Sequence, residues 1–266
     1  MMTIVAAVKT RDCLVLGTDS VGTIMGQIAQ GGQTAVFKSY PHTQKLFQLE
    51  NYSIGVTTWG QGAIGGRSIA GLIADFSASL GSRPGTIEEA ANRLNQFFLP
   101  LYNAEFSAVP AAQRPALGFF VGGYPTGAAF SELWEVNYSP QVPPESRMRQ
   151  VMPQNFFGVG WNGVSHPFFR LQRGIDPRLE AQLLRSGVTQ QTIDSAKQAV
   201  QGLEMSVFYD SMPVQAAVDF CKYVLDVTIG YNRFEIGTPL TGEPVQLAVI
   251  TQRSPFRWVA ELPFHT

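Results

Sequence analysis

Charged residues are scarce in this sequence of 266 residues. They make up 15% of the chain, whereas an ordinary soluble protein has about 25%. Lys and Arg (19) balance Asp and Glu (20) to a net charge of −1. Because a near-neutral chain has no basic patch to attract phosphate groups, we expect neither nucleic acid nor a membrane as a partner. So few charges also suggest that part of the surface is covered by subunit contacts.

Long apolar runs and a disulfide framework are also missing. No stretch approaches the roughly 20 apolar residues of a membrane-spanning helix. Lys9 interrupts the first apolar segment and no basic segment precedes it, so we expect no secretory signal peptide. The two cysteines, Cys13 and Cys221, lie in apolar patterns typical of buried thiols. We therefore expect a cytoplasmic protein.

Histidine is rare enough to exclude several chemistries. The three histidines are His42, His166 and His265, and the sequence contains neither HExxH nor CxxC, so no zinc site is expected. None of the three lies in a nucleophile-elbow motif. The segment GSRPG at 81–85 lacks the lysine and the spacing of a phosphate-binding loop. An enzyme with this sequence is expected to use no metal, no cofactor and no histidine base.

Apolar periodicity predicts strands at both ends of the chain and helices between them. Thr10-Arg11-Asp12 joins two apolar strands into an opening β-hairpin, and a loop rich in Gly and Gln follows at 21–33. Pro100 is expected to kink or shorten the second helix. The expected strands are 3–9, 13–19, 34–40, 45–49, 52–60, 117–123, 129–138, a segment near 149–157, 244–252 and 256–264. The expected helices are 63–80, 87–106, most of 161–210 and a long helix after Met212-Pro213.

This order of elements favours antiparallel sheets covered by helices over alternating βαβ units. No repeat or linker divides the sequence, so we expect a single domain over 1–266 with an extra helical insertion around 168–205. Two interpretations of the insertion stay open. It is a solvated pair of amphipathic helices, which we favour, or a docking surface for a neighbouring assembly.

Thr3 is the first candidate for chemistry. A threonine hydroxyl is a poor nucleophile that needs a base, and one solution is the α-amine of the same residue once it begins the mature chain. That amine has a pKa of about 7.7–8.0 and accepts a proton near neutral pH. The alternative is that Thr3 is merely the first residue of an edge strand.

Asp19 and Lys45 are the candidates to support Thr3. Antiparallel pairing through the turn at 10–12 brings residue 3 opposite residues 18–20. Lys45 begins a short strand, and a buried lysine beside Thr3 would stabilise the deprotonated hydroxyl while Asp19 compensates its charge. The alternative is an ordinary surface ion pair.

Five segments of the sequence carry a family resemblance. They are TIVAAVKTRDCLVLGTDS (3–20), QKLFQLENYSIGVTTWGQG (44–62), FGVGWNG (157–163), SMPVQAAVDFCKYVLD (211–226) and GEPVQLAVITQ (242–252). In this order they resemble the β-subunits of proteasomes and their bacterial relatives, a branch of the N-terminal-nucleophile hydrolases. The resemblance touches most of the chain except 139–153 and about 168–205.

The resemblance implies an α+β fold, a four-layer αββα sandwich of two antiparallel β-sheets flanked by helices. It implies a threonine-type peptidase that cleaves peptide (amide) bonds without a cofactor, inside a self-compartmentalised homo-oligomeric ring. Peptides or unfolded proteins would be the substrates, and an ATP-dependent unfoldase is a candidate partner.

The resemblance also implies a role for each matched residue. Thr3 is the nucleophile and, through its freed amine, the base; Lys45 tunes the hydroxyl and Asp19 holds the lysine. The backbone N–H of Gly60, or of the neighbouring Trp59, stabilises the oxyanion.

Three further positions are implied to bind substrate. Thr23 pairs its backbone with an extended peptide, and Gly22 and Thr58 wall the first specificity pocket. Both of these are small, which suggests room for a bulky side chain. The alternative for them is a turn glycine and a strand threonine.

The sequence departs from the family pattern at the groups that support the nucleophile. Val159 replaces a serine, and the aspartate after the last long helix is matched only by Asn232 and Glu235. Met1-Met2 must be removed to free the amine of Thr3. The alternative function is therefore a catalytically silent structural or binding subunit.

Overall fold

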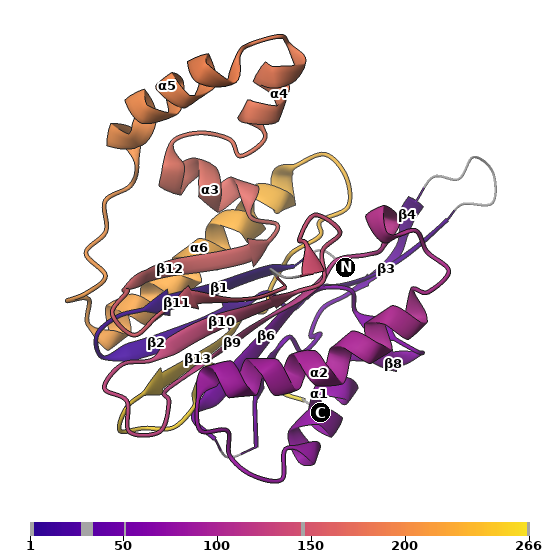
Figure 1. Cartoon of the computed structure of the whole chain (residues 1–266), viewed down its shortest axis with the longest axis vertical. Coiled ribbons are helices and arrows are strands. Elements are labelled where there is room, and N and C mark those ends of the chain that lie inside the picture. Colours follow the sequence, from indigo (N-terminus) through magenta and orange to yellow (C-terminus); the bar gives the residue numbers. More distant parts are fainter. Residues whose placement is uncertain (1–2, 28–33, 51, 145–146, 265–266) are drawn as a thin grey trace.

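Two β-sheets lie at the centre of the computed structural model, which describes residues 3–27, 34–50, 52–144 and 147–264 (Figure 1). Among these residues each sheet has five strands, and the neighbouring strands pair antiparallel. The first sheet has the spatial order β12 (Gly158–Gly163), β1 (Ile4–Lys9), β2 (Cys13–Thr18), β13 (Gln246–Thr251) and β14 (Arg257–Ala260). The second has the order β11 (Met148–Met152), β10 (Glu132–Asn137), β9 (Leu117–Gly123), β6 (Ile54–Gly60) and β5 (Leu46–Gln48).

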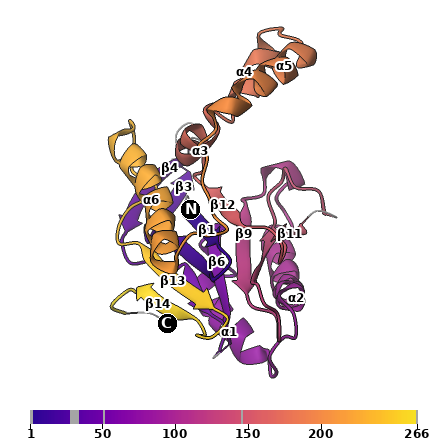
Figure 2. The same ribbon diagram turned by 90° about the vertical axis from the view of Figure 1, so that its left-hand side faces the viewer.

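Helices cover the outer face of each sheet (Figures 1 and 2). The helices are α1 (Ile69–Ser79), α2 (Ile87–Glu105), α3 (His166–Arg173), α4 (Leu179–Arg185), α5 (Gln190–Val200) and α6 (Val214–Phe234), with short 3-10 turns at Ala111–Gln113 and Gln201–Leu203. Helices α1 and α2 pack on the second sheet through side chains such as Phe76 and Phe98. Helices α3 and α6 pack on the first sheet through side chains such as Phe168 and Cys221.

The two sheets face each other across a shared apolar core. Leu14 and Leu16 of the first sheet belong to the same buried cluster as Trp59 and Phe120 of the second. The layer order is therefore helices, sheet, sheet, helices. The mixed α+β class with antiparallel sheets, expected from the sequence, is confirmed.

The opening hairpin is buried on both faces. Every residue of β1 and β2 is buried, which agrees with their almost continuous apolar character, because strands covered on both sides need no polar alternation. The turn is fixed by the Thr10 hydroxyl, which accepts hydrogen bonds from the backbone N–H groups of Asp12 and Cys13 (both 3.2 Å). This hairpin sets Thr18 opposite Val5 and thereby places the residues that follow β2 beside the start of β1.

Three expectations about local structure were wrong. The expected helix over 63–80 begins only at Ile69, because Ala63–Ile64 and Arg67–Ser68 are short strands. Part of the expected loop at 21–33 is a strand, β3 (Gly22–Gln27), which pairs with β4 (Thr34–Tyr40) in a small separate sheet. Helix α2 continues through Pro100 to Glu105, so the expected shortening at this proline is wrong. Its buried face extends past the proline from Phe98 to Tyr102, and this packing outweighs the backbone hydrogen bond that the proline removes.

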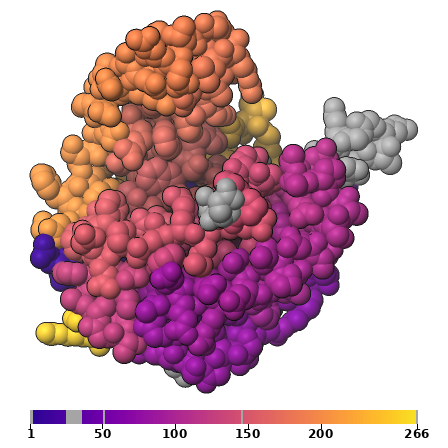
Figure 3. All heavy atoms as spheres, in the orientation of Figure 1, coloured from indigo at the N-terminus to yellow at the C-terminus, as the bar shows by residue number. Residues whose placement is uncertain are grey.

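A second small sheet and a projecting helical arm complete the fold. Strands β7 (Ala63–Ile64) and β8 (Arg67–Ser68) pair just before α1. Helices α4 and α5 extend away from the sandwich, as Figure 2 shows, and form the upper lobe of the space-filling view (Figure 3). We call residues 176–203 the α4–α5 arm. Among the described residues, no helix combines the length and the apolar character needed to cross a lipid bilayer.

Candidate active site

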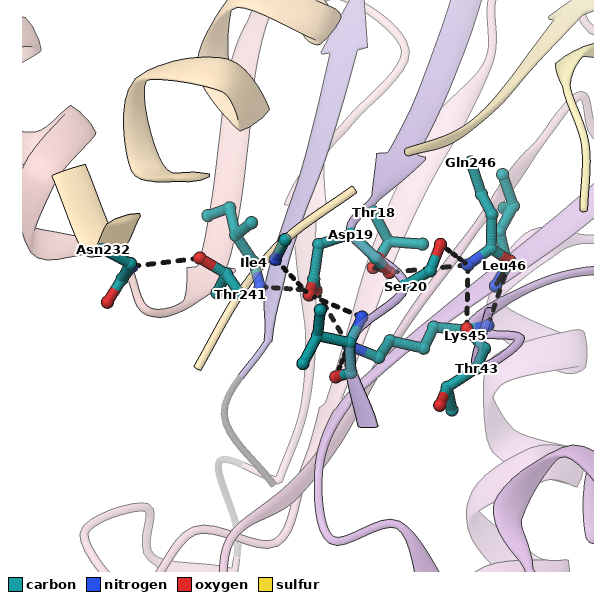
Figure 4. Close-up of polar contacts among 12 residues, drawn as sticks. Ile4, Thr18, Asp19, Ser20, Thr43, Lys45, Leu46, Asn232, Thr241 and Gln246 are labelled. Carbon is teal, nitrogen blue, oxygen red and sulfur yellow. Dashed lines mark hydrogen bonds and ion pairs between the residues drawn. The ribbon is translucent and has the colours of Figure 1, made fainter. Parts of the chain in front are cut away.

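Asp19 lies at the end of the hairpin and is fully buried. Its carboxylate accepts four hydrogen bonds (Figure 4). Oδ1 accepts from the Ile4 backbone N–H (3.2 Å) and from Lys45 Nζ (2.8 Å). Oδ2 accepts from the backbone N–H groups of Val21 (3.0 Å) and Gly242 (3.3 Å). Such a set of donors favours the ionised carboxylate in spite of its burial.

Lys45 reaches Asp19 from the other sheet. It directly precedes β5, and its Nζ donates to Asp19 Oδ1 and to the Val21 carbonyl (2.7 Å). Both side chains of the ion pair are 0% exposed. Burial lowers the pKa of the Lys45 ammonium and raises that of the Asp19 carboxyl, while the attraction between the two charges opposes both shifts. The site thus holds a charged amine out of water with one carboxylate to balance it.

Thr3 adjoins this pair through Ile4, whose backbone N–H binds Asp19. Thr3 is buried, and its Oγ1 has no hydrogen-bond partner among the described residues. Its carbonyl accepts from Val164 N (2.7 Å) above Gly163, which has a φ of +89°. A Cβ on Gly163 would lie 1.8 Å from the Thr3 carbonyl oxygen, so only glycine fits beneath Thr3.

Strand β6 brings Thr58 to Lys45, and Trp59 and Gly60 follow it on the same strand. The Thr58 backbone N–H donates to the Lys45 carbonyl (3.0 Å), and the buried Thr58 hydroxyl is unpartnered within the described ranges. Trp59 is buried in the shared core. Gly60 ends the strand with a φ of +87°, and a Cβ there would lie 2.1 Å from the Ala116 carbonyl oxygen. The backbone at Gly60 is therefore held in a conformation that favours glycine.

Gly22 and Thr23 lie on β3, just beyond Asp19. A Cβ on Gly22 would lie 2.3 Å from Thr43 Oγ1, so a side chain there would clash with the Thr43 side chain. Thr23 pairs with Ser39 of β4. In the described part of the chain, the other edge of β3 carries no strand.

Asn232 and Glu235, expected to replace the family's supporting aspartate, differ in position: Asn232 lies near the groups that bind Asp19 and Glu235 does not. Asn232 Nδ2 donates to Thr241 Oγ1 (3.0 Å), next to the Gly242 N–H that binds Asp19. Glu235 is exposed and accepts a hydrogen bond from the Tyr231 hydroxyl (3.4 Å), with no hydrogen bond or ion pair to Asp19 or Lys45 in the described structure. It lies away from the Asp19–Lys45 pair because the chain leaves α6 at this residue in an extended conformation.

Val159 is a ladder residue of β12 that pairs with Val8. It packs at the edge of the apolar cluster between the first sheet and α6. It offers no polar group to the site.

Two groups that hydrogen bond around the Asp19–Lys45 pair were not predicted from the sequence. Gly242 supplies a backbone donor from a loop, and no side-chain pattern signals such a contact. Gln246 is a fully buried amide at the start of β13 that hydrogen bonds to the segments on both sides of the ion pair. A polar residue inside the apolar run PVQLAVITQ is the signal that points to it.

No family model matches this sequence, and no curated protein matches it either. Solved structures do share the fold. Anbu from Hyphomicrobium sp. strain MC1 matches with a TM-score of 0.51 and 12% identity, over 97% of this chain and 87% of that chain. Anbu (ancestral beta-subunit) from Yersinia bercovieri matches with a TM-score of 0.50 and 14% identity over the same fractions. Identities this low show a common fold only.

These structures correct the family expected from the sequence. The expected membership of the proteasome β-subunit family is wrong, because the structural neighbours are Anbu proteins, which are proteasome-like but distinct. The segments that carry the resemblance are strands and helices of the shared sandwich, so they indicate the architecture and not the family.

The site offers no evident place for a metal. Within the described ranges, no group of three or more His, Cys, Asp or Glu side chains is arranged to hold a metal ion. Its polar groups are instead one ammonium, one carboxylate, hydroxyls and backbone donors. Such groups suit proton transfer and nucleophilic attack.

Proposed function

We propose that the protein is an amide hydrolase of the N-terminal-nucleophile type that cleaves peptide bonds with the hydroxyl of Thr3. One observation carries the proposal: the unpartnered, buried Thr3 hydroxyl lies at the residue next to Ile4, whose N–H binds the fully buried Asp19–Lys45 pair. A buried hydroxyl without a partner costs about 1–3 kcal/mol. A lysine removed from water in the same region, bound to the carboxylate that accepts from the Ile4 N–H, is a group suited to stabilise an alkoxide.

In the proposed reaction, removal of Met1 and Met2, which lie outside the described residues, frees the α-amine of Thr3. The amine takes the proton of Oγ1 as the oxygen attacks the carbonyl carbon of the peptide bond. The new C–O bond forms while the carbonyl π electrons move to oxygen. When this intermediate collapses, the C–N bond breaks and the amine returns its proton to the leaving nitrogen. Water then hydrolyses the ester by the same steps and restores Thr3.

The neighbouring groups support these steps. The positive charge of Lys45 stabilises the deprotonated hydroxyl, and Asp19 keeps the lysine charged and in place. The backbone N–H of Gly60 is the proposed donor to the oxyanion, with Trp59 as the neighbouring candidate; one such donor is typically worth about 10²–10³ in rate. Asn232 is a supporting residue that acts through Thr241, whereas Glu235 is not part of the proposed site.

The substrate is proposed to be an extended peptide. Its backbone would add to the free edge of β3 at Thr23, with its side chain against Gly22 and Thr58. Assembly into a homo-oligomeric ring is a further part of the proposal. It is supported by the low fraction of charged residues and by exposed apolar side chains such as Phe208 (87%) and Ile236 (104%).

The test is hydrolysis of fluorogenic peptides by protein that begins at Thr3, with the N-terminus checked by intact mass spectrometry. We expect this form to hydrolyse the peptides and the Thr3→Ser variant to retain activity. In the Thr3→Ala variant we expect the rate of hydrolysis to fall by at least about 10³-fold. Undiminished hydrolysis by Thr3→Ala would refute the nucleophile.

A catalytically silent structural or binding subunit is the second candidate. It is favoured by Val159, which supplies no hydroxyl, and by Glu235, which is exposed. Absence of hydrolysis by protein that begins at Thr3, together with an intact assembly in native mass spectrometry, would support this candidate.

A further inference from the structure

The Gln246 side chain is a buried amide in an otherwise apolar strand. It begins β13, pairs with Thr18 of β2 in the ladder and is 0% exposed. A buried primary amide needs partners for two N–H groups and one oxygen, and leaving them unpaired is costly.

The oxygen of this amide holds the segment that carries Lys45. Gln246 Oε1 accepts from the backbone N–H groups of Lys45 (3.1 Å) and of Leu46 (3.3 Å). Because Leu46 is the first residue of β5, the amide binds the second sheet at the point where its edge strand begins.

The nitrogen of the same amide holds the segment that carries Asp19. Gln246 Nε2 donates to the Thr43 carbonyl (3.0 Å), the Ser20 hydroxyl (3.2 Å) and, at 3.4 Å, the Asp19 carbonyl. Ser20 in turn donates from Oγ to the Pro244 carbonyl. One side chain thus satisfies backbone groups of both segments whose side chains form the buried ion pair.

We infer that Gln246 is a positioning residue that sets the distance between the Asp19 carboxylate and the Lys45 ammonium through the main chains on either side of them. A role of Gln246 in catalysis rests on the proposed function. Its role in placing the ion pair does not, since the ion pair exists whether or not the chain hydrolyses a peptide. Removing the amide breaks the hydrogen bonds that link the main chain at Lys45 and Leu46 to Asp19 and Ser20, so the contact between the ammonium and the carboxylate is free to lengthen.

The direct test is a pH titration of the lysine side chains by NMR of the whole chain, labelled at lysine Cε. The lysines are Lys9, Lys38, Lys45, Lys197 and Lys222. The signal of Lys45 is assigned by its absence from the Lys45→Arg variant. In Gln246→Met, which keeps the length of the side chain and removes every polar contact, we expect the Lys45 pKa to fall, because a longer contact weakens the attraction to Asp19 that raises this pKa.

A matched control separates positioning from general loss of stability. Ile250 is a fully buried residue of the same strand that pairs with Leu14, away from the ion pair. The Ile250→Ala variant is expected to lower Tm while leaving the Lys45 titration unchanged. A Lys45 titration that is unchanged in folded Gln246→Met, or shifted equally in Ile250→Ala, would overturn the inference.

Gln246→Asn keeps the test decisive if Gln246→Met does not fold. It keeps a neutral amide that is one methylene shorter, so it cannot bind both segments at once, and it adds no charge beside the ion pair. We expect the Lys45 pKa to shift in the same direction as in Gln246→Met. A Lys45 titration identical to that of the unmodified chain would contradict the positioning role.

Hydrolysis supplies the functional readout. In protein that begins at Thr3, Gln246→Met is expected to lower kcat about tenfold or more and move the pH profile, with KM little changed, because the amide does not touch the substrate. If the unmodified chain hydrolyses nothing, the proposed function fails, but the NMR titration still decides the placement of Lys45. An unchanged kcat and pH profile in Gln246→Met would refute the catalytic part.

Discussion

Two fully buried lysines lie at opposite ends of the opening hairpin, and they are held in different ways. Lys45 at the open end is paired with Asp19 at 2.8 Å. Lys9 at the turn end donates to the carbonyls of Pro153 (2.5 Å) and Gln154 (3.1 Å) and lies 5.4 Å from the centre of the Phe157 ring. Carbonyl oxygens satisfy the N–H groups of Lys9 without balancing its charge.

The two ends of the sandwich differ in how readily their lysine loses its proton. Burial lowers the pKa of Lys9 to about 8 with only the more distant Glu132 opposing it, so Lys9 is an ammonium that tolerates deprotonation. Lys45 is tied to a carboxylate that is itself held by three backbone N–H groups. Removal of either member of that pair leaves an uncompensated buried charge.

Replacing Lys45 should therefore have the largest effect. Lys45→Met leaves the Asp19 carboxylate buried without a cation, and we expect a loss of about 3–5 kcal/mol in the free energy of unfolding. Urea unfolding followed by tryptophan fluorescence measures it. The double variant Asp19→Asn, Lys45→Met should recover part of the loss, and equal stability of the single and double variants would contradict this account.

Replacing Lys9 should have the opposite sign at neutral pH and a distinct pH dependence. Between pH 8 and 10.5 the folded chain holds fewer protons at Lys9 than the unfolded chain, because burial lowers this pKa from 10.5 to about 8. Stability from this group therefore rises with pH through that window, by up to about 3 kcal/mol. Lys9→Met should remove the rise and should leave stability at pH 7 equal or higher. If Lys9→Met lowered the free energy of unfolding at pH 7 as much as Lys45→Met does, the proposed difference between the two lysines would be wrong.

The glycine beneath Thr3, Gly163, is enclosed by backbone, whereas Gly187 in the α4–α5 arm is not. Gly163→Ala introduces both a left-handed alanine and a clash with the Thr3 carbonyl, whereas Gly187→Ala in the α4–α5 arm introduces only the first, since its φ is +83° and no atom lies within 4 Å. We expect Gly163→Ala to be about 2 kcal/mol more destabilising than this control. Thermal unfolding of both variants measures the difference. Equal destabilisation by both would show that the backbone under Thr3 moves to accommodate the added methyl group without cost.

An exposed ion pair provides the smallest expected effect. Lys197 binds Glu180 in the arm at 2.6 Å, with side chains 42% and 38% exposed. Lys197→Met should change the free energy of unfolding by less than about 1 kcal/mol, and added salt should reduce even that. A loss comparable to that of Lys45→Met would mean that burial does not explain the difference between these ion pairs.

Much of the site follows from local patterns in the sequence. The hairpin at 3–19 is set by two apolar strands and a polar turn, and its pairing places Asp19 beside the start of β1. The short strand after Lys45 then brings the lysine to the same end of the sandwich. The hairpin depends on neighbours in sequence, so periodicity is enough to predict it, whereas the contact of Lys45 with Asp19 joins two sheets and periodicity alone does not predict it.

The remaining contacts depend on segments far apart in the sequence. Gln246 is 201 positions from Lys45, and the Gly242 donor comes from a loop without periodicity. Glu235 was expected near the nucleophile, but the end of α6 turns it to solvent. The strand at Gly22–Gln27 was expected as a loop because its glycines and glutamines carry no strand signal. Tertiary pairing with β4 makes it a strand.

The Asp19–Lys45 pair bridges the two sheets, since Asp19 follows β2 and Lys45 precedes β5. Any sliding of one half of the sandwich over the other must lengthen or shorten the contact between ammonium and carboxylate. The charge balance of that buried pair therefore depends on how the two sheets are positioned relative to each other.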